Sequence, residues 1–300
     1  MIETATVSKQ LGGKQVLTDV SLTAEDGHVT GFVGPNGAGK TTLMKIVACL
    51  IPADSGSATV NGRPFSEALV PARTLGIYLS GEWLPARRSG EDHLRFVCET
   101  QGLPTTQVRS MLERVGLWGA HRREIRTYSL GMRQRLGIAA ALIGDPANIM
   151  LDEPVNGLDP NGVIWLRGLL KEQAACGKAV LLSSHLMTEL ELVADRIVML
   201  HEGKVVRAGT LAELASHTAD SEVYIASPDL GAVVELLCAQ GLSARPEGDG
   251  ALVAGARAER VGQIVFGAGL SLSHLAPRIH SLEDLFLSST TSDRKQEEAA

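Results

Sequence analysis

Long hydrophobic runs are missing from this 300-residue chain. No apolar stretch approaches the roughly 20 residues that a helix needs to cross a bilayer. The first ten residues, MIETATVSKQ, lack the apolar segment of a secretion signal. We therefore expect any association with a membrane to depend on a partner.

Basic charge and paired cysteines are scarce as well. The net charge is −6, with acidic and basic residues mixed, so the chain has no basic footprint for nucleic acid. Its four cysteines lack C-x-x-C spacing, which favours structural thiols in a reducing compartment. What remains is a chain with 44% hydrophobic residues, enough for one large domain and a smaller one.

The clearest positive signal is a glycine-rich loop between an apolar strand at Val29–Val33 and a helix from about Lys40. The loop matches G-x-x-x-x-G-K-[ST], whose backbone N–H groups cradle nucleotide phosphates. The lysine is expected to reach the β- and γ-phosphates, and the Thr41 hydroxyl to bind Mg²⁺. The predicted ATP-binding residues are Gly34, Pro35, Asn36, Gly37, Ala38, Gly39, Lys40, Thr41 and Thr42.

Two carboxylates follow a second apolar strand at residues 149–151. Ligands lie at the carboxyl ends of strands in an open α/β sheet. Asp152 is therefore expected to hold Mg²⁺, and Glu153 to orient or deprotonate an attacking water. A third strand ends at His185, whose imidazole is expected to hydrogen-bond the γ-phosphate and the water.

A second candidate anion site lies in the stretch RTYSLGMRQRLGIAAAL, residues 126–142. It combines a polar turn with the start of a helix, where free N–H groups and the helix dipole attract anions. Ser129 is also expected to cap this helix, since capping and phosphate binding use the same donors.

Together these motifs resemble the ATP-binding subunits of ABC transporters over residues 2 to about 214. GPNGAGKTT, YSLGM, IMLDEP, NGLD and SSH match, in order, the family's phosphate loop, signature, Walker B strand, D-loop and switch histidine. The variant SLGMRQRLGIA is similar to the subgroup that serves drug, antibiotic and bacteriocin export or self-immunity.

The resemblance implies an α/β fold of the P-loop NTPase (RecA-like) class and two subunits packed head to tail, here as a homodimer. It implies ATP and Mg²⁺ as cofactors, separate transmembrane permease subunits as partners, and a location at the cytoplasmic face of the cell membrane. The signature of one subunit would complete the ATP site of the other. The residues carried over are Ser129, Leu130, Gly131 and Met132 for the signature and Asp159 for the D-loop.

Two positions depart from the family pattern. Leu11 stands where the family usually has an aromatic residue that stacks on adenine, so we expect weak base discrimination. Ser80 replaces the Q-loop glutamine and is expected to reach Mg²⁺ only through water, with Glu82 as an alternative ligand. Trp83 and Leu84 follow, either as a docking surface or as ordinary packing under a loop.

The pattern of elements predicts an ATPase domain over residues 1–212, with a helical subdomain at about 83–145. The composition then changes, and the predicted order β-α-β-β-α-β suggests a small ferredoxin-like α+β domain over 213–290. A short helix is expected from Ser281, and a flexible tail over 291–300. This domain carries no catalytic constellation, and its role is open between dimer support, regulation and neither.

Three functions remain to be weighed. The first is an ATP-hydrolysing motor for an exporter with separate membrane subunits. The second is a soluble ABC-type protein of ribosomes or DNA, which the single, uninterrupted cassette disfavours. The third is a weakly or non-hydrolysing regulator or scaffold, which Leu11 and Ser80 favour and Glu153 and His185 oppose.

Overall fold

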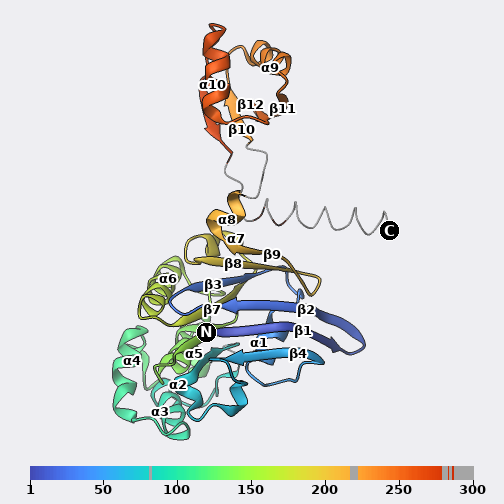
Figure 1. Ribbon diagram of the computed structural model, residues 1–300. Helices are drawn as coiled ribbons and strands as arrows, with labels where there is room; N and C mark the ends of the chain where they lie inside the picture. Colours follow the sequence, from blue (N-terminus) through green and yellow to red (C-terminus); the bar gives the residue numbers. More distant parts are fainter. Residues whose placement is uncertain (81–82, 217–221, 279–282, 284–285, 287–300) are drawn as a thin grey trace. The chain divides into compact units, whose positions relative to one another are not determined.

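The computed structural model describes residues 1–80, 83–216, 222–278, 283 and 286. The chain forms two compact units (Figure 1). One holds Met1–Leu211 and, among the described residues near the end of the chain, Phe286; the other lies within Ala212–Leu285. Within the described residues, no helix is long and apolar enough to span a bilayer.

A six-stranded sheet forms the centre of the first unit. Its strands run in the order β5-β6-β7-β3-β8-β9, parallel except for the edge strand β9. Every residue of β3, β6 and β7 is buried, as expected of parallel strands covered on both faces. The strands are β3 (Val29–Val33), β5 (Leu75–Tyr78), β6 (Asn148–Leu151), β7 (Ala179–Ser184), β8 (Arg196–His201) and β9 (Lys204–Thr210).

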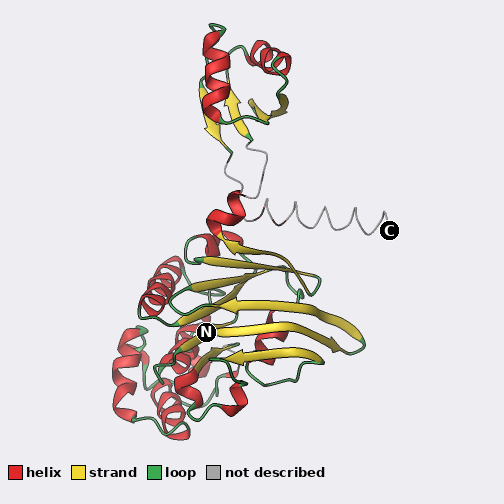
Figure 2. Cartoon of the chain, in the orientation of Figure 1, coloured by secondary structure: helices red, strands yellow, loops and turns green. Residues whose placement is uncertain are grey.

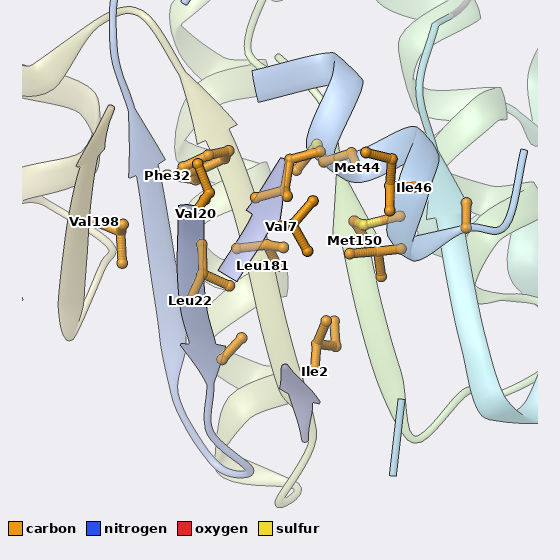
Figure 3. Close-up of a cluster of buried hydrophobic side chains, with 14 of the residues drawn as sticks. Ile2, Val7, Val20, Leu22, Phe32, Met44, Ile46, Met150, Leu181 and Val198 are labelled. Carbon is orange, nitrogen blue, oxygen red and sulfur yellow. The ribbon is translucent and has the colours of Figure 1, made fainter. Parts of the chain in front are cut away.

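A second, antiparallel sheet is formed by strands near the start of the chain. It contains β1 (Ile2–Leu11), β2 (Lys14–Ala24) and β4 (Ser55–Val60), in the order β2-β1-β4. Its buried side chains, the core sheet and helix α1 (Lys40–Val47) share one hydrophobic cluster (Figure 3). Labelled members are Ile2, Val7, Val20, Leu22, Phe32, Met44, Ile46, Met150, Leu181 and Val198. This cluster fixes the start of α1 against the end of β3.

Helices dominate residues 83–145, as predicted, and they gather at one side of the sheets (Figure 2). They share a separate core that includes Leu94, Leu112 and Leu136. The α-helices of the unit after α1 are α2 (Pro71–Thr74), α3 (Gly90–Thr100), α4 (Val108–Arg114), α5 (Leu130–Leu142), α6 (Pro160–Ala175) and α7 (Met187–Glu191). Short 3₁₀ turns lie at Phe65–Glu67, Thr105–Gln107, Trp118–Ala120 and Ile125–Thr127.

The second unit has the β-α-β-β-α-β order expected of a ferredoxin-like domain. Its antiparallel sheet runs β11-β12-β10-β13. The elements, after the connecting helix α8 (Leu211–Ser216), are β10 (Val223–Ala226), α9 (Leu230–Ala239), β11 (Ser243–Glu247), β12 (Gly250–Ala254), α10 (Ala258–Gly267) and β13 (His274–Pro277). The helix expected from Ser281 falls largely, and the tail at 291–300 entirely, outside the described residues.

Candidate nucleotide-binding site

The phosphate loop joins the end of β3 to the start of α1, and its glycines are required by close contacts. A Cβ at Gly34 would lie 2.2 Å from the carbonyl oxygen of Leu200. Gly39 has φ +110°, and a Cβ there would lie 2.7 Å from Leu17 Cδ2. Gly37, at φ +81°, also adopts a backbone conformation that side chains disfavour. The loop therefore closes tightly at the N-terminus of α1, a position where backbone N–H groups can bind an anion.

Lys40 is the buried cation of this loop. Its Nζ donates to the carbonyl oxygens of Gly34 at 2.6 Å and Pro35 at 3.2 Å, and lies 3.4 Å from Glu153 Oε1. A pocket of about 330 Å³ opens beside the ammonium group. It is lined by Val16, Asn36, Gly37, Ala38, Gly39, Lys40, Thr41, Thr42 and Glu153. Because the walls combine consecutive loop residues with a lysine, the pocket suits a chain of phosphates.

Asp152 links three elements at the carboxyl edge of the sheet. Its Oδ2 accepts a hydrogen bond from Thr41 Oγ1 at 2.6 Å, and its Oδ1 accepts one from Ser183 Oγ. A threonine hydroxyl beside a carboxylate is an oxygen donor pair that fits Mg²⁺. The described residues contain no cluster of three or more His, Cys, Asp or Glu side chains arranged to hold a metal ion. The remaining ligands would therefore be phosphate oxygens and water, which is usual for Mg²⁺ at phosphate sites.

Glu153 lies between Lys40 and the histidine at the end of β7. Its backbone φ is +47°, which is unusual for a residue with a side chain. The backbone N–H donates to Ser183 Oγ at 2.9 Å, and the carboxylate Oε2 lies 2.8 Å from His185 Nδ1. The structure thus brings the predicted base and the predicted switch histidine into direct contact.

The signature turn lies at a different cavity from the phosphate loop. Ser129 caps α5, because its Oγ accepts a hydrogen bond from the Met132 N–H at 3.2 Å. Asp159 caps α6 by accepting from the Gly162 N–H at 2.9 Å. Both line a cavity of about 600 Å³, together with Gly116, Leu117, Leu130, Gly131, Met132, Arg135 and Gly157. No residue of this lining belongs to the phosphate-loop pocket.

The positions that depart from the family pattern lie apart from one another. Ser80 lines a cavity of about 340 Å³ with Asp152 and Glu153. Leu11 ends β1 at the hairpin turn and is 44% exposed. Glu82 lies outside the described residues. The next two residues differ in burial. Trp83 is 63% exposed, whereas Leu84 packs against the helical core.

Sequence reasoning missed two buried polar residues beside this site. Ser183 belongs to the SSH motif, where the sequence predicts a role for the histidine alone, yet its hydroxyl contacts both Asp152 and the backbone of Glu153. The sequence predicts no more for Gln134 than a place in a helix, yet its amide donates to the carbonyl oxygen of Asn156 at 2.6 Å. Burial of a polar side chain becomes visible only once the elements are packed.

Comparison with known proteins agrees with this geometry. Residues 17–156 match the ABC transporter family, and residues 221–283 match a domain of unknown function, DUF8746. An uncharacterized ABC transporter ATP-binding protein of Bacillus subtilis, YdbJ, is 33% identical over 97% of this chain and 96% of its own length. The daunorubicin resistance ATP-binding protein DrrA3 of Streptomyces coeruleorubidus is 32% identical, with coverages of 97% and 96%. The lantibiotic transport ATP-binding protein SrtF of Streptococcus pyogenes is 36% identical, with coverages of 69% and 89%.

Solved structures show the same fold. The ATP-binding subunit of an ABC transporter matches with a TM-score of 0.66 and 27% identity, over 73% of this chain and 93% of that one. A dimeric ATP-binding cassette, MJ0796, solved in a post-hydrolysis state with ADP and Pi, matches with a TM-score of 0.64 and 21% identity, over 70% and 98%.

The fold and the phosphate loop define the class of this protein as a P-loop nucleotide-binding ATPase. Its full-length relatives narrow the class further, and the chain belongs to the ATP-binding proteins of ABC transporters.

Proposed function

We propose that this protein is the ATP-hydrolysing subunit of an exporter whose membrane subunits are separate chains. The observation that carries the proposal is the meeting of Lys40, Thr41, Asp152, Glu153 and His185 at one edge of the parallel sheet. Phosphoryl transfer to water needs three parts. These are a cation for the phosphates, a pair of oxygen ligands for a metal, and a carboxylate–imidazole pair that acts on the water.

ATP is proposed to bind along Gly34 to Thr42, with Lys40 moving from the loop carbonyls to the β- and γ-phosphates. Thr41 and Asp152 would hold Mg²⁺, with Ser80 acting only through water, and the ion would neutralise charge on the phosphates. Glu153 is proposed to orient the attacking water and accept its proton, while His185 holds the γ-phosphate side of the site. The contact between Glu153 and His185 supports this division of roles.

The signature turn is proposed to complete the site of a second subunit. Ser129, Leu130, Gly131 and Met132 line a cavity that lacks the lysine and the Glu153 carboxylate of the phosphate-loop pocket. In a head-to-tail homodimer, each signature would contact the γ-phosphate bound by the other chain, with Asp159 beside it. Closure of the dimer around ATP would perform the mechanical work and hydrolysis would release it.

The proposed partners are transmembrane permease subunits at the cytoplasmic face of the cell membrane, with no role for nucleic acid. Relatives named for daunorubicin resistance and lantibiotic transport support export of a drug, antibiotic or peptide. The daunorubicin resistance relative aligns along almost the whole chain, the C-terminal unit included.

The decisive experiment is size-exclusion chromatography of the Glu153→Gln variant, with and without Mg-ATP. Removing the carboxylate is expected to block hydrolysis and leave ATP binding intact, so a monomer should become a dimer only with ATP. Ser129→Asp in the same background is the control, because a negative charge at the signature should prevent the shift. Measured ATP binding without any shift in size would contradict the composite site.

A second candidate, a nucleotide-dependent regulator with little hydrolysis, is favoured by the serine at the Q-loop position. Steady-state ATP turnover of the wild-type chain separates the two. Turnover that Glu153→Gln abolishes supports the motor, whereas ATP binding with the same trace turnover in both chains supports the regulator.

A further inference from the structure

The first turn of α5 contacts the loop that follows Glu153 in the same chain. Gly157 lies directly under the Leu130 side chain: a Cβ at this glycine would be 2.2 Å from Leu130 Cδ2 and 2.4 Å from its Cγ. The glycine also has φ +78°. The leucine side chain therefore packs directly on the glycine backbone. A side chain at position 157 would disrupt this contact.

A hydrogen bond fixes the same loop one residue earlier. The Gln134 amide donates to the Asn156 carbonyl oxygen at 2.6 Å, and the residue is only 6% exposed. Its Oε1 has no hydrogen-bond partner within the described part of the chain. Leu130 and Gln134 are four residues apart, so they share one face of the helix. We call this pair of contacts the α5 clasp.

The α5 clasp acts on the segment that carries the catalytic carboxylate. The Asn156 N–H donates to the Glu153 carbonyl oxygen at 3.2 Å, which closes a turn between the clasped residue and Glu153. Glu153 itself has φ +47°, a conformation that persists only where the surrounding structure holds it. Support of this turn is therefore support of the Glu153 backbone.

Helix α5 also belongs to the helical core. Leu136 and Ala139 are buried there with side chains of α3 and α4. Movement of the helical subdomain would therefore move α5 as well. The α5 clasp would transmit this displacement to the turn after Glu153. Such a link needs no ligand to bridge the two segments, because both contacts lie within one chain.

We propose that Leu130 and Gln134 are positioning residues that couple the signature turn to Glu153 of the same chain. The inference rests on the proposed function, in which the signature contacts the nucleotide of the partner while Glu153 serves the nucleotide of its own chain. The α5 clasp then connects the two ATP sites of the dimer. Occupation of one site sets the position of the catalytic carboxylate at the other.

A double-mutant cycle tests the contact between Leu130 and Gly157 by ATP turnover. Gly157→Ala pushes a methyl group into the leucine and should lower kcat about tenfold with KM within about twofold, since binding at Lys40 is untouched. Adding Leu130→Ala makes room for that methyl group. The double variant should recover to within about threefold of Leu130→Ala alone, the remaining loss reflecting the strain of a side chain at φ +78°. Losses that simply multiply in the double variant would overturn the clasp.

Hydrogen–deuterium exchange tests the hydrogen bond without relying on catalysis. Gln134→Leu should speed exchange at the amides of Asn156 and Leu158 by about tenfold or more, because the turn loses its support. Leu69→Ala is the control, since that leucine is 98% exposed and lies far along the sequence. Unchanged exchange in Gln134→Leu would also overturn the proposal. A wild-type chain that fails to hydrolyse ATP contradicts the motor function, while the exchange result still decides the clasp.

Discussion

The phosphate loop and the signature turn both present the N-terminus of a helix, but their surroundings differ. At the start of α1, a buried lysine, the Asp152 carboxylate and Glu153 lie within hydrogen-bond or ion-pair distance of the loop. At the start of α5, Ser129 caps the helix, and the acid in the cavity, Asp159, caps α6. In the proposed function, the first region binds and activates the nucleotide, whereas the second region only binds it. The difference is the physical reason to expect that the two regions meet across a dimer.

The largest effect is expected from the first region. Lys40→Ala should weaken ATP binding by at least about 100-fold, because charge-assisted hydrogen bonds to two phosphates are lost. Isothermal titration calorimetry with Mg-ATP measures the change. Lys45→Ala, on the last turn of the same helix, is the matched control and should bind as the wild type does. Equal affinities of the two variants would show that the loop does not hold the phosphates.

The signature should respond differently. Ser129→Asp keeps a good helix cap but adds a negative charge where the partner's γ-phosphate is proposed to lie. Affinity for ATP in the monomer should stay within about twofold, while ATP turnover should fall about 100-fold. Ser129→Asn, a neutral cap, separates charge from capping and should retain most activity. Loss of monomer binding in Ser129→Asp would remove the distinction between the two regions.

The first region could be predicted from the sequence because its parts are local. A strand, a glycine loop and a helix are contiguous, and β6 and β7 each end directly at their polar residues. Asp152, Glu153 and His185 then follow from the rule that parallel strands share one carboxyl edge. The contact of Ser183 with Asp152 depends on the register of β6 beside β7, which no local pattern encodes.

The second region could be predicted only in part. The cap at Ser129 is local and was expected, but the contacts of Leu130 with Gly157 and of Gln134 with Asn156 join segments more than twenty residues apart. A leucine and a glutamine inside a helix carry no sign of such partners in the sequence. The unusual φ of Glu153 was equally invisible, since glutamate has no preference for that conformation.

Leu11, at the end of β1, offers a smaller change, which should affect ATP binding at the first region alone. Leu11→Tyr should strengthen ATP binding about threefold to tenfold, because stacking of an aromatic ring adds about 0.5–1.5 kcal/mol. The affinity for GTP, measured in parallel by calorimetry, reports whether base discrimination also changes. Leu69→Tyr provides an exposed control for the added ring. A Leu11→Tyr variant that binds ATP as the wild type does would place the base away from this hairpin.

The helical subdomain that carries the signature should be the more acid-sensitive region. Burial, with a smaller contribution from Arg88, lowers the pKa of His93 to about 4, below the ordinary value of about 6.5. Between about pH 4 and pH 6.5, His93 therefore binds a proton in the unfolded chain but not in the folded chain. The contribution of the neutral His93 side chain to stability is complete above about pH 6.5 and is lost as the pH falls towards 4.

His93→Gln should remove this pH dependence. Allowing for partial exposure of the imidazole, the wild type should lose about 1–2 kcal/mol more than the variant between pH 7 and pH 5. Urea unfolding followed by tryptophan fluorescence measures the difference, since Trp118 and Trp165 pack on the helical core. His28→Gln, at an exposed position, should lose as much stability as the wild type. If His93→Gln loses as much stability as the wild type, protonation of other groups causes the loss. The helical subdomain is then no more acid-sensitive than the sheet that holds the phosphate loop.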